Sequence, residues 1–154
     1  MNGIIWWIQN RFQSVQHLGS DLLSQHLAQD RNQVVLLDVR SLAEYEVSHL
    51  EGAIHVDPET SDMEQLVNEL GLAGRAANSQ VVCYCTVGYR SCMLAKRLAP
   101  FLPSLRVYNL EGGLVKWANE RRSIVDSREQ PTRLVHPYSS TWTYLLKPAF
   151  RAQI

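Results

Sequence analysis

Short apolar runs recur along the chain and alternate with stretches of helical spacing. The runs cover residues 34–37, 53–56, 81–84 and 106–109. Their length and their β-branched residues are typical of buried strands. Apolar residues at helical spacing occupy the intervals 20–28, 61–70, 88–99 and 114–118. Strands that alternate with helices predict an α/β fold, in which helices cover both faces of a parallel sheet.

Size and charge limit what the chain can be. Its 154 residues suffice for one compact domain but not for two. Fifteen basic residues balance fifteen acidic ones, so no overall field attracts nucleic acid, and we expect no nucleic-acid partner. We consider membrane association unlikely, because no stretch reaches the roughly 18 apolar residues of a membrane span. Residues 1–8 lack the features of a signal peptide, and we expect a cytoplasmic protein.

Two extensions flank the predicted domain, which we place at residues 18–125. Residues 1–17 have apolar side chains close to helical spacing and predict an amphipathic helix, which includes Trp6 and Trp7. Residues 126–154 contain three prolines and several aromatic residues, too apolar for a solvated linker. We expect this tail to pack on the domain or on a partner subunit, and the extensions could form a homodimer contact.

Three cysteines lie within ten residues, and Cys85 has the most informative position. It stands where the strand at 81–84 meets the helix at 88–99. A strand that turns into a helix leaves several backbone N–H groups free, and together with the helix dipole they favour a thiolate at the turn. Arg90 adds a fixed positive charge five positions on. This arrangement predicts a nucleophilic cysteine in an anion-binding loop.

The other cysteines and the histidines receive weaker predictions. Cys83 is expected in the core, as free cysteine usually is. Cys92 could act as a resolving thiol, but core packing is favoured. The cysteines have no metal-ligand spacing, and His49 and His55 are expected to be ordinary surface or turn residues. We therefore predict neither a metal site nor a cofactor.

Three motifs in order resemble the rhodanese family. Residues 35–45 read VLLDVRSLAEY, are followed by HLEGAI at 49–54, and resemble its first signature. Residues 110–117 read LEGGLVKW and resemble its second. Between them, CTVGYR at 85–90 stands where the family has its active-site cysteine. The resemblance covers about residues 20–122.

The resemblance implies a rhodanese-like fold with a central five-stranded parallel sheet, whose fifth strand would be a short one before Ser20. It implies a thiosulfate sulfurtransferase-like enzyme. Such enzymes take a sulfane sulfur onto the cysteine as a persulfide and pass it to cyanide or to a thiol, which can belong to a protein. The expected catalytic residue is Cys85, and Asp38 and Arg40 are expected to pair and support the loop. The residues expected to bind the substrate are Thr86, Val87, Gly88, Tyr89, Arg90 and Ser91.

Two details of the loop bear on its substrate. Related dual-specificity phosphatases use a loop one residue longer, so the six residues from Cys85 to Arg90 favour sulfur transfer over phosphatase or arsenate chemistry. Many members that use thiosulfate have a basic residue directly after the cysteine, where this chain has Thr86. A persulfide donor is therefore as reasonable as thiosulfate. The alternative from another class is a regulatory rhodanese module that binds a partner through its extensions.

Overall fold

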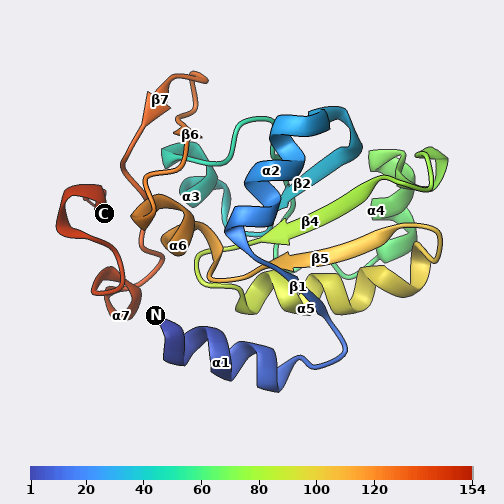
Figure 1. Cartoon of the computed structure of the whole chain (residues 1–154), viewed down its shortest axis with the longest axis horizontal. Helices are drawn as coiled ribbons and strands as arrows, with labels where there is room; N and C mark the ends of the chain where they lie inside the picture. The colour runs from blue at the N-terminus through green and yellow to red at the C-terminus, as the bar shows by residue number, and fades with distance from the viewer. Residues whose placement is uncertain (154) are drawn as a thin grey trace.

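The computed structural model, which describes residues 1–153, is built around a five-stranded parallel sheet (Figure 1). The strand order is β1-β5-β4-β2-β3, so β4 lies at the centre. The strands are β1 (Gln16–Leu18), β2 (Val34–Asp38), β3 (Ile54–His55), β4 (Gln80–Tyr84) and β5 (Arg106–Leu110). The α/β fold with a five-stranded parallel sheet is as predicted.

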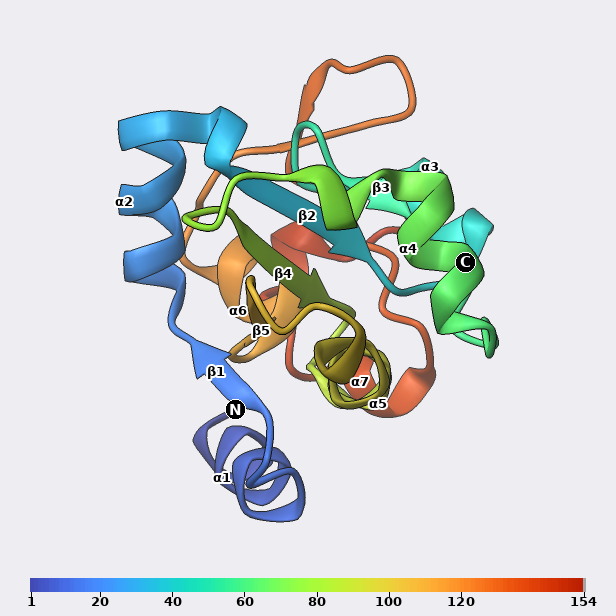
Figure 2. The ribbon, with the colours of Figure 1, turned by 90° about the vertical axis from the view of Figure 1, so that its right-hand side faces the viewer.

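The central strands are buried because helices cover the sheet on both sides. Four of the five residues are buried in each of β2 and β4, which explains their continuous apolar runs. Figure 2 shows α2 on one side of the sheet and α4 and α5 on the other. The helices of the central part are α2 (Ser20–Asp30), α3 (Leu42–Val47), α4 (Met63–Leu70), α5 (Tyr89–Leu98) and α6 (Gly113–Asn119), with 3₁₀ turns at Arg31–Gln33, Leu72–Gly74 and Ala99–Phe101.

The first seventeen residues do not form one helix. Helix α1 (Asn2–Arg11) ends at its C-cap, Phe12, and the chain then enters β1, which pairs in parallel with β5. The predicted helix was therefore too long. Strand β1 is only three residues long with a single buried residue, so its sequence carries almost no strand periodicity. It is the short fifth strand that the resemblance implied.

The ends of two helices follow from local side chains and backbone. The N-cap of α4 is Asp62, whose side chain accepts a hydrogen bond from the backbone N–H of Gln65. Helix α2 is capped by Gly19, and Ser20 is its first residue. Gly71 ends α4 in the left-handed conformation.

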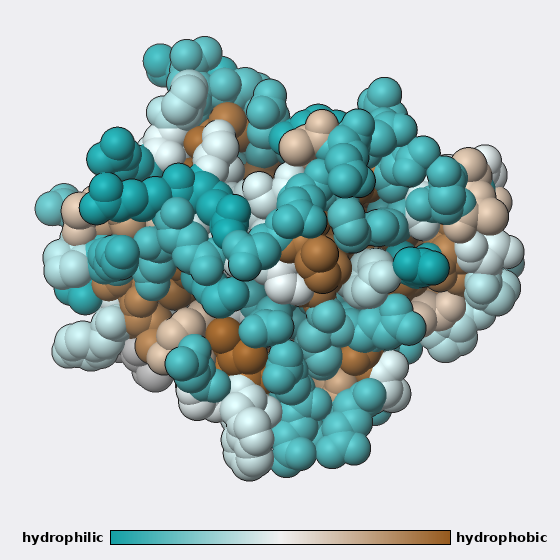
Figure 3. Space-filling model, viewed as in Figure 1, coloured by the Kyte–Doolittle hydropathy of each residue, from teal (hydrophilic) through white to brown (hydrophobic). Residues whose placement is uncertain are grey.

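The C-terminal tail folds back on the domain. After α6 come an antiparallel pair, β6 (Ile124–Val125) with β7 (Pro131–Thr132), the short helix α7 (Ser140–Thr143) and a 3₁₀ turn at Pro148–Phe150. Val135, Leu146 and Phe150 belong to the buried core cluster. The face shown in Figure 3 is mostly hydrophilic, with small separate hydrophobic patches. None of the described helices is long and apolar enough to cross a membrane.

Candidate active site

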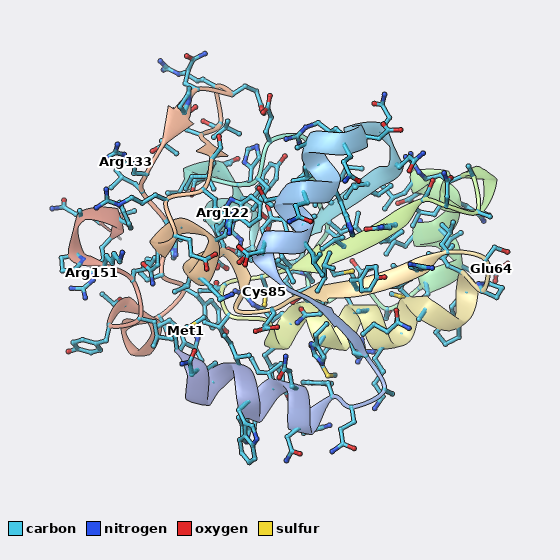
Figure 4. The ribbon with its side chains drawn as sticks, in the orientation of Figure 1. Met1, Glu64, Cys85, Arg122, Arg133 and Arg151 are labelled. Atoms are coloured by element: carbon cyan, nitrogen blue, oxygen red, sulfur yellow. The ribbon has the colours of Figure 1, made fainter. Side chains whose placement is uncertain are left out.

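Cys85 lies directly after β4, at the carboxyl end of the sheet. Figure 4 shows it near α6, far from Glu64 at the other end of the molecule. Its side chain is almost enclosed, and the backbone N–H of Gly88 donates to its Sγ at 3.1 Å. Gly88 has a φ of 121°, a left-handed value that disfavours a side chain. The glycine thus lets the chain turn sharply enough to aim an amide at the sulfur.

Ser91 provides the second polar contact to the sulfur. Its Oγ lies 3.4 Å from the Sγ of Cys85 and 2.6 Å from Oδ1 of Asn109, on β5. Both Ser91 and Asn109 are buried. The sulfur therefore faces one backbone donor and one hydroxyl, and this hydroxyl also bonds to an amide.

Helix α6 fixes the same loop from the other side. The N–H groups of Leu114 and Val115, in its first turn, donate to the carbonyl oxygens of Cys85 and Thr86 at 2.9 and 3.1 Å. Gly113 makes this approach possible, because a Cβ there would lie 2.5 Å from the carbonyl oxygen of Thr86. The second glycine of the LEGG motif is thus required by contact with the cysteine loop.

Arg90 does not point at the sulfur. Its guanidinium forms a two-pronged ion pair with Glu44, at 2.8 and 3.0 Å, and also donates to Oγ1 of Thr86 at 2.9 Å. Thr86 donates in turn to Glu44 at 3.1 Å. Its charge is therefore matched by a buried carboxylate, and substrate binding by Arg90 stays a prediction.

Glu44 is held ionised by this arrangement. Burial alone would raise its pKa, but the hydrogen bonds and charge of Arg90, with smaller contributions from Arg40 and Ser41, lower it from 4.5 to about 2. Ser41 and Glu44 also form the capping box that begins α3. One carboxylate thus links the start of α3 to the cysteine loop.

Asp38 and Arg40 pair as expected, below the loop. Two hydrogen bonds of 2.8 and 2.7 Å join them, and both side chains are fully buried. Arg40 also donates to the carbonyl oxygen of Ser48 at 2.6 Å. This is a buried ion pair rather than a surface one, so removing either partner would leave an uncompensated charge.

Both extensions contact the loop. The ring of Tyr89 stacks on Trp7 and meets Phe12 edge-on, with ring centroids 6.0 and 5.3 Å apart. On the other side, the guanidinium of Arg90 lies 4.0 Å from the ring centroid of Tyr138. The two segments outside the predicted domain therefore contact neighbouring residues of the cysteine loop, Tyr89 and Arg90.

The remaining cysteines lie in the core. Burial, with a smaller effect of Cys85, raises the pKa of Cys83 to about 12 and raises that of Cys92 as well. The structure thus favours core packing for Cys92. Within residues 1–153, no group of three or more His, Cys, Asp and Glu side chains could hold a metal ion.

The two histidines are more involved than predicted. His49 is buried, stacks on Tyr45 and bonds to its carbonyl oxygen at 2.8 Å, so the surface prediction was wrong for this residue. Nε2 of His55 lies 2.7 Å from the carbonyl oxygen of Arg40. His55 therefore supports the segment at Arg40, whereas His49 packs on α3 through Tyr45.

The sequence matches the model of a known protein family over most of the chain. Residues 21–120 match the model of the rhodanese-like domain. The chain belongs to the rhodanese-like domain family. The matched rhodanese-like segment includes Cys85 and both signatures but leaves out α1, β1 and the C-terminal tail.

The sequence is also similar to part of several larger proteins. The chain is 31% identical over 117 residues to a tRNA uridine(34) hydroxylase of Buchnera aphidicola, and 32% identical over 108 residues to one of Pectobacterium carotovorum. These matches cover 75% and 70% of the chain but only 36% and 29% of the relatives, so the chain spans about a third of their length.

Among solved structures, a thiosulfate sulfurtransferase of Pseudomonas aeruginosa superposes with a TM-score of 0.64 at 18% identity, over 92% of this chain and 26% of that one. A rhodanese-like domain from Anabaena gives 0.55 at 19% identity, over 71% and 78%. At these identities the likeness concerns the fold alone.

Two buried polar residues at the site had not been predicted from the sequence. Glu44 carries one signal, the Ser41-x-x-Glu44 capping box, which marks a helix start but not a partner 46 residues later. Asn109 carries a weaker one, a polar residue near the carboxyl end of a strand. Of the predicted loop residues, the structure brings Gly88 and Ser91 to the sulfur, whereas Thr86 and Arg90 bond to Glu44.

Proposed function

We propose that this protein is a sulfurtransferase that carries a sulfane sulfur on Cys85 as a persulfide. The observation that carries the proposal is the short contact between the backbone N–H of Gly88 and the Cys85 Sγ, in a six-residue loop at the end of β4. A backbone donor fixed at this distance stabilises a thiolate. Membership of the rhodanese-like family supports the same chemistry.

The reaction balances in two displacements. In the first, the Cys85 thiolate attacks the sulfane sulfur of the donor, an S–S bond forms on Cys85, and the donor's own sulfur bond breaks with its electron pair. Sulfite leaves if the donor is thiosulfate, and a thiolate leaves if it is a persulfide. In the second, a thiol or cyanide attacks the outer sulfur, and the Cys85 thiolate departs.

The charge pattern of the loop favours a persulfide donor over thiosulfate. Thiosulfate is a dianion and needs fixed positive charge, but Arg90 is matched by Glu44 and the position after the cysteine is Thr86. A small-molecule or protein persulfide carries less charge. Arg40 does not supply the missing positive charge either, because it forms an ion pair with Asp38.

The test is sulfur uptake followed by intact mass. The protein is incubated with thiosulfate or with cysteine persulfide, and a gain of one sulfur atom is expected, larger with the persulfide. A thiol acceptor should remove it. Cys85→Ser should gain nothing, while Cys92→Ser serves as the control and should load normally. Failure to load from any donor would contradict the proposal.

The curated relatives are named for a different reaction. The chain matches about a third of each hydroxylase, so the part they share is the rhodanese-like segment. We infer sulfur chemistry for that segment and do not transfer the hydroxylation of a tRNA. We extend the proposal to a cytoplasmic setting, which the three free cysteines support.

A regulatory, partner-binding role is the second candidate, and one observation favours it. Large aromatic side chains are exposed on both extensions, where they are typical anchors of protein interfaces. Trp6 and Tyr144 are 66% and 82% exposed. Deleting residues 1–17 would remove β1, so substitution is the better test. Trp6→Ser with Tyr144→Ser should weaken self-association or partner binding without changing sulfur loading, and unaltered binding would remove the basis for this role.

Phosphatase activity is a third possibility that the same protein can test. The loop is one residue shorter than that of related phosphatases, and Arg90 is matched by Glu44. We expect no hydrolysis of an aryl phosphate by protein that loads sulfur. Hydrolysis that depends on Cys85 would reverse this order.

A further inference from the structure

A line of polar groups runs from the Cys85 sulfur through buried Ser91 and Asn109 and half-buried His17 to the end of α1. Ser91 Oγ contacts Sγ at 3.4 Å and Asn109 Oδ1 at 2.6 Å. Asn109 Nδ2 contacts Nδ1 of His17 at 3.2 Å, and Nε2 of His17 contacts the carbonyl oxygen of Phe12 at 3.2 Å. His17 lies on β1 and Asn109 opposite it on β5. Both His17 and Phe12 lie outside the matched family segment.

The direction of each hydrogen bond follows from the far end. The carbonyl of Phe12 can only accept, so Nε2 of His17 carries the proton, and Nδ1 of the neutral ring is an acceptor. Asn109 must then present its NH₂ group to His17 and its oxygen to Ser91. Because a hydroxyl has a single proton, the short bond from Ser91 to Asn109 draws that proton away from Cys85.

We propose that His17 and Asn109 are positioning residues that, through Ser91, set how many donors the Cys85 sulfur receives. In the arrangement seen, the one proton of the Ser91 hydroxyl has two acceptors within reach, Asn109 Oδ1 at 2.6 Å and Cys85 Sγ at 3.4 Å, and the shorter contact takes it. The N–H of Gly88 is then the sulfur's donor. If the amide of Asn109 turns over, its NH₂ group faces Ser91, and the hydroxyl proton is free to bond to a thiolate or to the outer sulfur of a persulfide. No proton passes through the amide, which transmits orientation only.

The proposal rests on the proposed function for its consequence but not for its test. The readout is the rate of Cys85 alkylation by iodoacetamide as a function of pH, with the adduct located by peptide mass. This rate follows the thiolate and requires no sulfur transfer. Buried Cys92 falls on a separate tryptic peptide, and cleavage after Tyr84 with chymotrypsin separates buried Cys83 from Cys85.

Two substitutions of Asn109 should act in opposite directions. Asn109→Ala removes the competing acceptor, so Ser91 can donate to the thiolate, and the pH midpoint should fall by about one unit. Asn109→Asp keeps the shape but supplies only acceptors and a negative charge, so the midpoint should rise. A merely structural role would move both variants in the same direction, and that result would overturn the proposal.

Two further variants test the roles of Ser91 and His17 separately. The effect of Asn109→Ala should vanish when Ser91→Ala is also present, because the hydroxyl transmits it. His17→Phe should lower the midpoint, since it frees the amide to turn, whereas His26→Gln, with its ring bonded to Gln80, is the control and should have no effect. A shift of equal size without Ser91 would overturn the proposal. If the shifts occur but no donor loads sulfur, the proposed function fails and the positioning role stands.

Discussion

At the scale of single residues, the proposed choice of sulfur donor depends on the pairing of Arg90. An arginine in a cysteine loop ordinarily offers its charge to an anionic substrate. Here Glu44, buried and bonded twice to the guanidinium, uses that charge inside the protein. The sulfur therefore faces two neutral groups, the N–H of Gly88 and the hydroxyl of Ser91, and this is why we propose a weakly charged sulfur donor rather than a dianion.

Releasing Arg90 should change the choice of donor. Glu44→Gln leaves the charge of the Arg90 guanidinium without a partner. Uptake of sulfur from thiosulfate should then rise roughly tenfold relative to uptake from cysteine persulfide, because the free charge can bind the dianion. The measurement is the ratio of the two loading rates. Glu46→Gln, an exposed residue of the same helix, is the matched control, and an unchanged ratio in Glu44→Gln would contradict this account.

The same carboxylate predicts acid sensitivity. The pKa of Glu44 is lowered from its ordinary value of 4.5 to about 2 by Arg90, so the folded state is favoured when this group is ionised. Its contribution is fully present above pH 4.5 and is lost as the pH falls toward about 2. Urea unfolding should show a stability gap between the natural protein and Glu44→Gln that narrows across this window. A gap independent of pH would show that the ion pair contributes nothing.

At the scale of elements, the second family signature, at the start of α6, holds the loop that contains Cys85. The start of α6 holds the carbonyl oxygens of Cys85 and Thr86, and the close approach requires Gly113. Gly113 at the start of this helix is thus explained by packing against a loop almost thirty residues earlier in the chain. The amides of the loop can then face the sulfur because its carbonyls are engaged elsewhere.

Adding one methyl group should test this contact. Gly113→Ala places a Cβ 2.5 Å from a backbone oxygen at a φ of 58°, so we expect a loss of about 1–3 kcal/mol in unfolding free energy and slower sulfur uptake. Gly74→Ala is the control, because nothing lies within 4 Å of its Cβ position. Equal behaviour of the two variants in urea unfolding and in loading would refute the contact's importance.

The sequence predicts the elements unevenly, for physical reasons. Strands β2 and β4 are buried on both faces, and their apolar runs are unmistakable. Strand β1 has one buried residue in three and is held by pairing with β5, so no local pattern reveals it. The site follows the same rule. Cys85 is found from its turn, whereas its links to Glu44, Asn109 and His17 depend on contacts distant in sequence.

At the scale of the whole molecule, the extensions are part of the site. Helix α1 supplies Trp7 and Phe12 against Tyr89, and the tail supplies Tyr138 against Arg90. Both segments lie outside the matched family region. These contacts place both extensions over residues of the cysteine loop.

The tail should also contribute to stability. Leu146 is 1% exposed in the core cluster, so Leu146→Ala should lower the unfolding free energy by about 2–5 kcal/mol. Tyr144→Ala, at an 82% exposed position two residues earlier, is the control and should change it by less than about 0.5 kcal/mol. A single urea transition is expected for both. If the Leu146 variant unfolds like the natural protein, the tail does not pack on the domain.

The most direct test of the central claim is the position of the sulfur after loading. The natural protein is treated with cysteine persulfide, unreacted thiols are blocked, and peptide mass spectrometry assigns the added sulfur among the three cysteines. We predict one added sulfur on Cys85, removed by a thiol acceptor, and none on Cys83 or Cys92. Sulfur found on Cys92 instead, or on no cysteine at all, would contradict the assignment of Cys85 as the sulfur carrier.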